Sequence, residues 1–173
     1  MALRPGRCYS KVKRPNTRVS KRKPRKSYVK GVPLPKIRSF EAGKPSPDYT
    51  SVFYLVTKGP VQIRHNALEA ARVSLNKNLE KGLGVGMYFM KVLVYPFHVL
   101  RENPMATGAG ADRYQTGMRL SFGKPISTAA QVKAGQRIIE VRTLKGREAA
   151  VKKALKIASS KIPVSCRIET KQL

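Results

Sequence analysis

The chain is poor in acidic residues, cysteine and tryptophan, and the shortage of cysteine excludes two kinds of site. Among 173 residues there are nine Asp and Glu, two Cys and no Trp. Cys8 lies in a basic segment and Cys166 near the other end, so the two form neither a disulfide framework nor a paired metal-ligand spacing. We expect no metal site and no cofactor, and the lone thiols suit a reducing, intracellular setting.

Long apolar runs are missing as well. No run approaches the ~18 residues of a membrane span, and the first residues lack the apolar core of a signal peptide. The sequence therefore predicts a soluble intracellular protein with no membrane partner.

Catalytic groups are equally scarce. His65 and His98 have no acid or nucleophile at a recognisable spacing, and a lone histidine is more often a structural hydrogen-bonding group. The glycines at 82–86 follow an expected helix, and Gly123-Lys124 precedes Pro125 instead of Ser or Thr, so neither stretch matches a phosphate-binding loop. No catalytic residue is predicted, and the chain is not expected to be an enzyme.

Basic residues are in large excess. Thirty-six Lys and Arg against nine acids give a formal charge of +27, and the pI is about 10.8. A compact body with this charge repels itself unless a polyanion neutralises it. Nucleic acid is the polyanion that such a pI indicates.

The first 40 residues are predicted to form a basic N-terminal arm. They hold fourteen Lys and Arg, no acid and five prolines, which favours extended backbone that follows phosphates and becomes ordered on binding. A merely solubilising tail is the alternative. Tyr9, Tyr28 and Phe40 either stack on exposed bases or pin the arm to the domain, and the sequence leaves both open. The residues expected to bind RNA are Arg4, Arg7, Lys13, Arg14, Arg18, Lys21, Arg22, Arg25, Lys36, Arg38 and, beyond the arm, Lys124.

Residues 41–173 are predicted to form a single α+β domain, a two-layer α/β sandwich. Two helices are expected: one over 67–81 with Asn66 as N-cap and Gly82 as its end, the other over 146–160. Strands are expected at 36–42, 50–57, 86–100, 126–132, 136–143 and 164–171, with 61–64 extending the pairing of 50–57. Pro96 breaks the ladder within 86–100 and indicates an edge or a bulge there. Two β-α-β units, at roughly 50–100 and 136–171, then give a mixed, mostly antiparallel sheet with both helices on one face.

Between these units lies the stretch 101–125, whose first part, 101–117, is predicted to be a long projecting loop. The first half of the stretch, 102–110, is dominated by small, flexible and turn-favouring residues, and no run there is long enough to fold on itself. Bases stand along it at Arg101, Arg113, Arg119 and Lys124. Long loops in small domains are usually functional or disordered, so we interpret it as a mobile basic projection; a tolerated surface insertion is the alternative.

Six irregular motifs carry a family resemblance. In chain order they are RPGRCY at 4–9, GVPLPKIR at 31–38, EAAR at 69–72, PFHVLR at 96–101, AGADR at 109–113 and QTGMR at 115–119. Over almost its whole length the chain resembles the large-subunit ribosomal proteins of the archaeal and eukaryotic L-ten-e family, with bacterial counterpart L-sixteen. Its lysine-rich 20–30 region and short C-terminus resemble archaeal members.

The resemblance implies a structural, cytoplasmic component of the ribosome that acts without a homo-oligomer. Family members contact large-subunit rRNA near the 5S rRNA, the aminoacyl-site tRNA and neighbouring ribosomal proteins, join late in subunit assembly and support tRNA accommodation. The loop toward the tRNA and the peptidyl-transferase centre then includes Arg101, Asn103, Met105, Arg113, Gln115 and Arg119. The rival hypotheses are a DNA-compacting protein, which would also bind duplex DNA, and an RNA-modifying enzyme, which would act in substoichiometric amounts.

Overall fold

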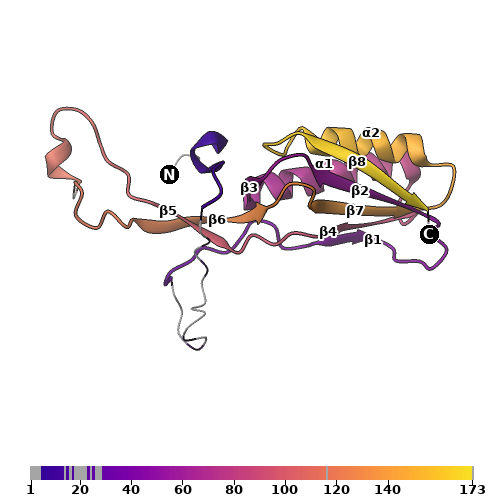
Figure 1. The fold of residues 1–173 in the computed structure, drawn as a ribbon, viewed down its shortest axis with the longest axis horizontal. Coiled ribbons are helices and arrows are strands. Elements are labelled where there is room, and N and C mark those ends of the chain that lie inside the picture. The colour runs from indigo at the N-terminus through magenta and orange to yellow at the C-terminus, as the bar shows by residue number, and fades with distance from the viewer. Residues whose placement is uncertain are drawn as a thin grey trace.

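The computed structural model describes residues 5–13, 15, 17, 23, 25, 29–115 and 117–172. Two helices, eight strands and two 3-10 turns occur in this part of the chain (Figure 1). In order they are η1 (Gly6–Tyr9), β1 (Glu41–Gly43), β2 (Ser51–Thr57), β3 (Val61–Arg64), α1 (His65–Leu83), β4 (Tyr88–Val92), β5 (His98–Glu102), η2 (Ala111–Arg113), β6 (Lys124–Val132), β7 (Arg137–Thr143), α2 (Glu148–Ser159) and β8 (Cys166–Gln172).

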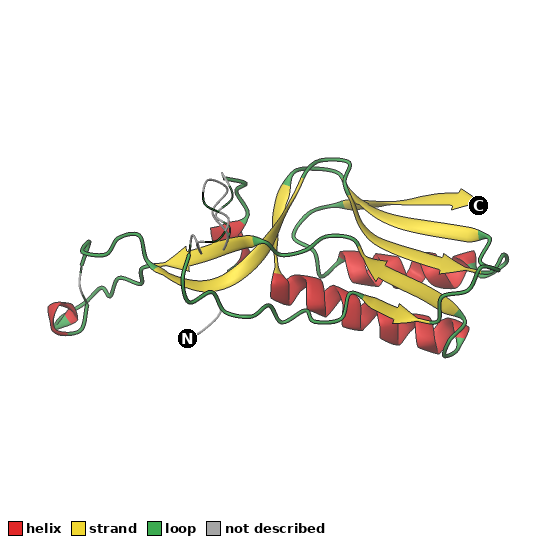
Figure 2. Ribbon diagram, turned by 90° about the horizontal axis from the view of Figure 1, so that it is seen from below, coloured by secondary structure: helices red, strands yellow, loops and turns green. Residues whose placement is uncertain are grey.

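The body of the molecule is a five-stranded sheet in the order β1-β4-β7-β2-β8, and every neighbouring pair is antiparallel. Strands β2 and β4 are therefore parallel on either side of β7 and are connected through α1. Likewise β7 and β8 lie on either side of β2 and are connected through α2, so two β-α-β units interleave. Both helices cover the same face of this sheet, as Figure 2 shows, and they pack against each other.

The core lies between the helices and this sheet. Strand β2 is buried along almost its whole length, as its β-branched and aromatic sequence predicts. The predicted apolar stripes of both helices are confirmed as buried: Leu68, Ala71, Leu75 and Leu79 on α1, and Val151, Ala154, Leu155 and Ala158 on α2. The α+β class and the placement of both helices on one face are confirmed.

The strands, however, form two sheets where one was predicted. Residues 86–100 were expected to be one strand with an edge or a bulge at Pro96, yet β4 ends at Val92, and the chain passes Pro96 before β5 begins at His98. Strand β5 joins a second sheet in the order β3-β6-β5. Proline has no N–H for a ladder hydrogen bond, which explains the break. Strand β3 pairs with β6 instead of extending β2, and β6, predicted to be weak, is the longest strand at nine residues.

Several element ends differ from the predictions. Asn66 is not an N-cap: β3 leads directly into α1, which begins at His65 with Arg64 in extended conformation. Gly82 does not end α1, which continues to Leu83 and stops at Gly84 with φ 90°. A Cβ on Gly82 would lie 3.3 Å from that of Ala150, so this glycine permits the close approach of α1 and α2.

The remaining ends shift by a few residues. The first strand is Glu41–Gly43, not 36–42, although the N–H of Val92 already donates to the carbonyl of Phe40 (2.7 Å). The second helix spans Glu148–Ser159 instead of 146–160. Within the described residues, no helix is both long and apolar enough to cross a membrane.

Candidate nucleic-acid interface

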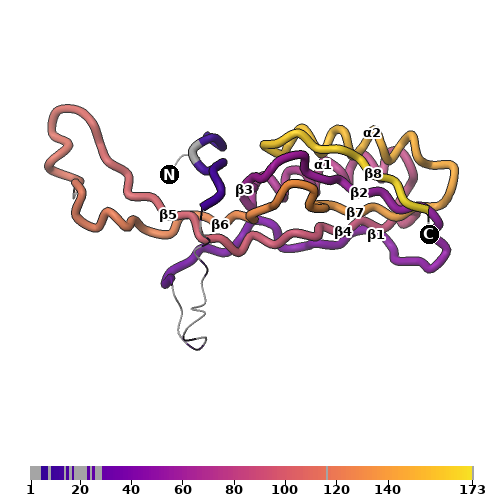
Figure 3. Tube along the Cα trace, viewed as in Figure 1, coloured from indigo at the N-terminus to yellow at the C-terminus, as the bar shows by residue number. Residues whose placement is uncertain are grey.

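Strands β5 and β6 form a hairpin that extends away from the body, and the loop of residues 103–123 lies at its far end. The chain trace in Figure 3 shows this projection on the side opposite to the C-terminus. Large apolar side chains in the loop are exposed: Met105, Tyr114, Met118, Leu120 and Phe122. Exposed apolar and basic groups on a projecting hairpin are typical of a contact surface.

The stem of the loop is tightly built. The guanidinium carbon of Arg101 lies 3.2 Å from the ring centroid of Phe122, and its Nη1 donates to the Phe122 carbonyl (3.0 Å). Gly123 has φ +73°, and a Cβ there would lie 2.6 Å from the carbonyl carbon of Glu102. Lys124 pairs with Glu102 in the β5–β6 ladder. The predicted site residues Arg101 and Lys124 are thus brought together at the stem; Phe122 and Gly123 were not foreseen.

The loop also has internal hydrogen bonds that join its outgoing and returning segments. The Asn103 side-chain amide donates to the Gly117 carbonyl (3.2 Å), and Gln115 Oε1 accepts from the Ala106 N–H (2.7 Å). The turn η2 follows Gly110 and buries Ala111. Asn103 and Gln115 therefore hold the loop together, whereas the predicted site residues Met105, Arg113 and Arg119 are exposed on it.

The arm is attached to this hairpin through Tyr9. Its hydroxyl donates to Glu102 Oε2 (3.2 Å), its carbonyl accepts from Gln62 Nε2 (2.7 Å), and the Arg64 guanidinium lies 5.6 Å from its ring centroid. Of the two roles left open for the aromatic residues of the arm, Tyr9 pins the arm to the domain. Phe40 does the same, because its ring stacks on that of Tyr95 at 5.2 Å. Tyr28 lies outside the described residues.

The described bases of the arm are exposed. Among the predicted RNA-binding residues these are Arg7, Lys13, Arg25, Lys36, Arg38 and, on β6, Lys124. The remaining ones, Arg4, Arg14, Arg18, Lys21 and Arg22, lie outside the described residues. Lys36 and Arg38 lie on either side of the buried Ile37, and both are exposed.

The acids are used in local contacts. Eight of the nine bond a neighbouring side chain, in the pairs Glu41–Lys91, Asp48–Ser46, Glu69–Arg72, Glu80–Asn76, Glu102–Tyr9, Glu140–Arg142, Glu148–Lys152 and Glu169–Arg167. Within the described ranges, no three His, Cys, Asp or Glu residues are close enough to hold a metal ion.

The structural role expected for a lone histidine is confirmed at His65. Its Nδ1 accepts a hydrogen bond from the backbone N–H of Lys36 (2.8 Å). Burial lowers the pKa of His65 below its usual value, and the nearby charges of Lys36 and Arg64 lower it further. The neutral imidazole thus fixes the end of the arm to the start of α1.

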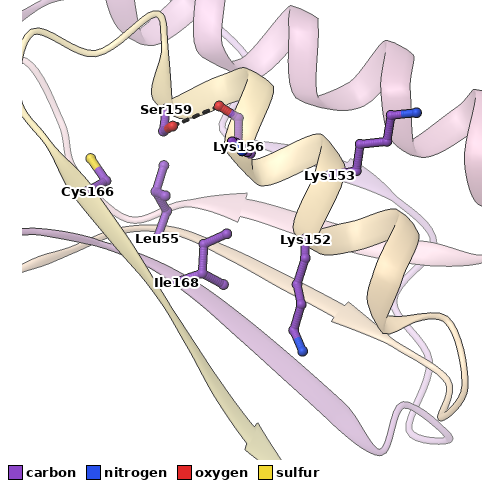
Figure 4. Close-up of a pocket in the computed structure, with 7 residues that line it drawn as sticks. All are labelled: Leu55, Lys152, Lys153, Lys156, Ser159, Cys166 and Ile168. Atoms are coloured by element: carbon purple, nitrogen blue, oxygen red, sulfur yellow. Dashed lines mark hydrogen bonds between the residues drawn. The ribbon is translucent and has the colours of Figure 1, made fainter.

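A hollow lies between α2 and β8. Figure 4 shows Leu55, Cys166 and Ile168 on the sheet side and lysines on the helix, with Ser159 Oγ donating to the Lys156 carbonyl (2.7 Å). Burial raises the pKa of the Cys166 thiol, so it stays protonated and is a poor nucleophile. This hollow has no catalytic arrangement.

Comparison with known proteins agrees with this geometry. Residues 16–169 match the family described as ribosomal protein L16p/L10e. The large ribosomal subunit protein uL16 of Staphylothermus marinus is 50% identical over 173 residues, which covers all of this chain and 96% of the relative. The protein of the same name from Sulfolobus acidocaldarius is 50% identical with the same coverage. That of Methanococcus maripaludis is 45% identical over 97% of this chain and 94% of its own.

Proposed function

Because the chain belongs to the ribosomal protein L16p/L10e family, whose members are structural ribosomal proteins and not enzymes, we propose that it acts in the large subunit by binding rRNA near the 5S rRNA and the aminoacyl-tRNA site. Its archaeal relatives place it among archaeal ribosomal proteins, and as part of the ribosome it is cytoplasmic. In this role it supports late subunit assembly and tRNA accommodation, beside neighbouring ribosomal proteins.

The observation that carries the proposal is the hairpin that projects from a rigid body. An rRNA-anchored body holds the loop at a distance, where it reaches a ligand that the body does not touch. Arg113, exposed in the loop, and Arg101, held on the Phe122 ring at the stem, are the bases it offers toward tRNA. The arm, pinned at Tyr9, supplies phosphate contacts close to the stem.

Binding by the arm is expected to be strongly salt-dependent, because each phosphate contact releases a counterion. If about half of its fourteen bases do so, log affinity falls with log salt at a slope of roughly −5 to −6. Arginine suits forked phosphate contacts better than lysine, so Arg7 and Arg38 should contribute most among the described bases.

Two experiments test the arm and the loop separately, and the first concerns the arm. Arg7, Lys13 and Arg25 are changed together to Gln; the matched control changes Lys152, Lys153 and Lys156 on α2 to Gln and removes the same charge. The arm variant should bind depleted large subunits with a salt slope smaller by about 2–3. If the salt slope decreases equally in both variants, net charge drives binding and the arm has no special role.

The loop variant changes Arg101 and Arg113 to Ala. It should join the subunit nearly as well as the unmodified chain but slow tRNA accommodation, measured as dipeptide formation. Deletion of residues 1–30 should block incorporation. A loop variant that fails to assemble, yet translates normally once present, contradicts this division of labour.

A further inference from the structure

We propose that one unpaired purine of the rRNA binds in a groove between the end of the arm and the linker that joins β4 to β5, stacked on Phe97 with its edge on the Thr128 hydroxyl. The groove measures about 390 Å³, within the range of about 300–1,000 Å³ of small-ligand sites. This inference rests on the proposed function and specifies which feature of the RNA this surface recognises. The surface is called the β4–β5 groove below.

The arm, the linker and the β5–β6 hairpin build the β4–β5 groove. Thr17 and residues 32–35 of the arm, with Leu34 76% exposed, line one side, and residues 95–97 of the linker line another. The buried Val99 and Thr128, paired with each other in the β5–β6 ladder, complete the lining. Since Pro33, Pro35 and Pro96 restrict the backbone on both sides, the groove is held open in the free protein.

Thr128 supplies the polar group. It is only 5% exposed, and among the groups that the structure describes its Oγ1 has no hydrogen-bond partner. A buried hydroxyl without a partner destabilises the fold, so an unmet hydroxyl in a groove indicates a missing ligand atom. The edge of a nucleobase carries both donors and acceptors, and either satisfies a hydroxyl.

Three aromatic rings follow one another toward the groove, and the last of them, Phe97, lines it. Phe40 stacks on Tyr95 at 5.2 Å, and Tyr95 contacts Phe97 at 4.5 Å between ring centroids. Phe97 is 68% exposed, so its outer face has room for another ring. Proteins that recognise RNA by sequence take unstacked bases onto such aromatic side chains. A purine, with two fused rings, covers more of the Phe97 face than a pyrimidine does.

Charge around the β4–β5 groove favours RNA over an apolar peptide. The exposed Lys36 directly follows the arm segment that lines it, the exposed Arg38 comes two residues later, and no acid lines it among the described residues. Phosphates flanking the inserted nucleotide therefore have two bases within three residues of the groove along the chain.

The experiment uses large subunits stripped of this protein and rebuilt with the full chain. The variants are Phe97→Ala, Thr128→Val and Thr128→Ser, with Val85→Ala as a control that truncates an exposed apolar side chain in the turn after α1. Dimethyl sulfate and kethoxal report unpaired adenines and guanines on the rRNA. Salt-dependent binding to the depleted subunits gives the affinity, and thermal unfolding of the free variants gives their stability.

We expect at least one purine that is protected by the unmodified chain, by Val85→Ala and by Thr128→Ser, and that becomes reactive with Phe97→Ala. Loss of base stacking should weaken binding about 5- to 150-fold, the equivalent of about 1–3 kcal/mol. Thr128→Val should expose the same purine in part while leaving the free protein at least as stable, because it removes an unsatisfied hydroxyl.

Identical protection in all variants overturns the proposal, as does a cross-link from a photoreactive residue at position 97 to a ribosomal protein instead of rRNA. Either result leaves the rRNA-binding function intact. Failure of the unmodified chain to join depleted subunits would instead refute the proposed function itself, so the two failures are distinguishable.

Discussion

Replacing Gly123 with Ala tests whether the loop is held by a close-packed stem. Gly123 lies where the chain returns from the loop to β6, with φ +73°. An added Cβ would lie 2.6 Å and 2.8 Å from the carbonyl carbon and oxygen of Glu102, and 2.9 Å from the nitrogen of Asn103. All three are backbone atoms, so no side-chain rotation relieves the clash. Gly110→Ala is the matched control, since its φ is +78° but nothing lies within 4 Å of its added Cβ.

Both substitutions place a Cβ in left-handed backbone, which costs about 1–2 kcal/mol. Gly110→Ala should cost no more than that. At Gly123 the backbone of Glu102 and Asn103 must also move, which disturbs the Glu102–Lys124 end of the ladder, at about 1 kcal/mol for a hydrogen bond. The Arg101–Phe122 contact is lost with it, at about 0.5–1 kcal/mol. The total is about 3–4 kcal/mol.

Thermal unfolding and amide hydrogen exchange give the readout. For a chain of this size about 1 kcal/mol shifts Tm by about 2–4 °C, so Gly123→Ala should lower Tm by about 6–16 °C and Gly110→Ala by about 2–8 °C. Exchange should accelerate along the ends of β5 and β6 in the first variant and stay unchanged there in the second. An equal decrease in Tm for the two variants, with slow amide exchange retained at the ends of β5 and β6, would refute the close-packed stem.

Two further predictions concern the contacts of the arm. Tyr9→Phe removes the hydrogen bond to Glu102, worth about 1 kcal/mol, so trypsin should cut at Arg7 and Lys11 roughly 5-fold faster. The control Tyr114→Phe, in the loop, should leave the cleavage rate unchanged. An unchanged cleavage rate with Tyr9→Phe would show that the hydroxyl does not hold the arm. His65 has a folded-state pKa below its unfolded value of about 6.5, so its contribution to stability is present above that pH and is lost as pH falls through the folded pKa. The variant His65→Asn keeps an acceptor for the Lys36 N–H but does not titrate. Its free energy of unfolding in urea should therefore fall less between pH 7.5 and pH 5 than that of the unmodified chain. An equal fall in both proteins would assign the pH dependence to other groups.

The secondary structure was predictable wherever one period dominates the sequence. Both helical stripes, including Leu75 and Leu155, are buried as the 3.6-residue spacing predicts, and β2 is buried as its apolar run predicts. The division into two sheets was not predictable from periodicity, because 86–100 has a continuous strand pattern on both sides of Pro96. Tertiary pairing assigns its two halves to different sheets, and a local pattern does not report pairing partners.

The contacts at the interface could not be predicted from the sequence for a similar reason. Composition identified the bases of the loop, but Arg101 is positioned by Phe122, which follows it by 21 residues, and Tyr9 reaches Glu102 across 93. Asn66 was misread because an N-cap was expected before the first apolar position of α1, whereas β3 continues without a turn into the helix. Nothing in the sequence around Gly123 indicates that its Cα packs against the backbone of Glu102.

The break at Pro96 connects the fold to the function. If β4 continued into β5 without it, the hairpin would lie along the five-stranded sheet, and the loop would stay against the body. Instead the chain leaves that sheet, and β5 pairs with β6 and through it with β3, which runs directly into α1. The hairpin is therefore anchored to the buried helix while its tip lies away from the body (Figure 1). The same linker presents Tyr95 and Phe97 beside the arm, so the segment that sends the loop outward also forms the surface where the β4–β5 groove meets RNA.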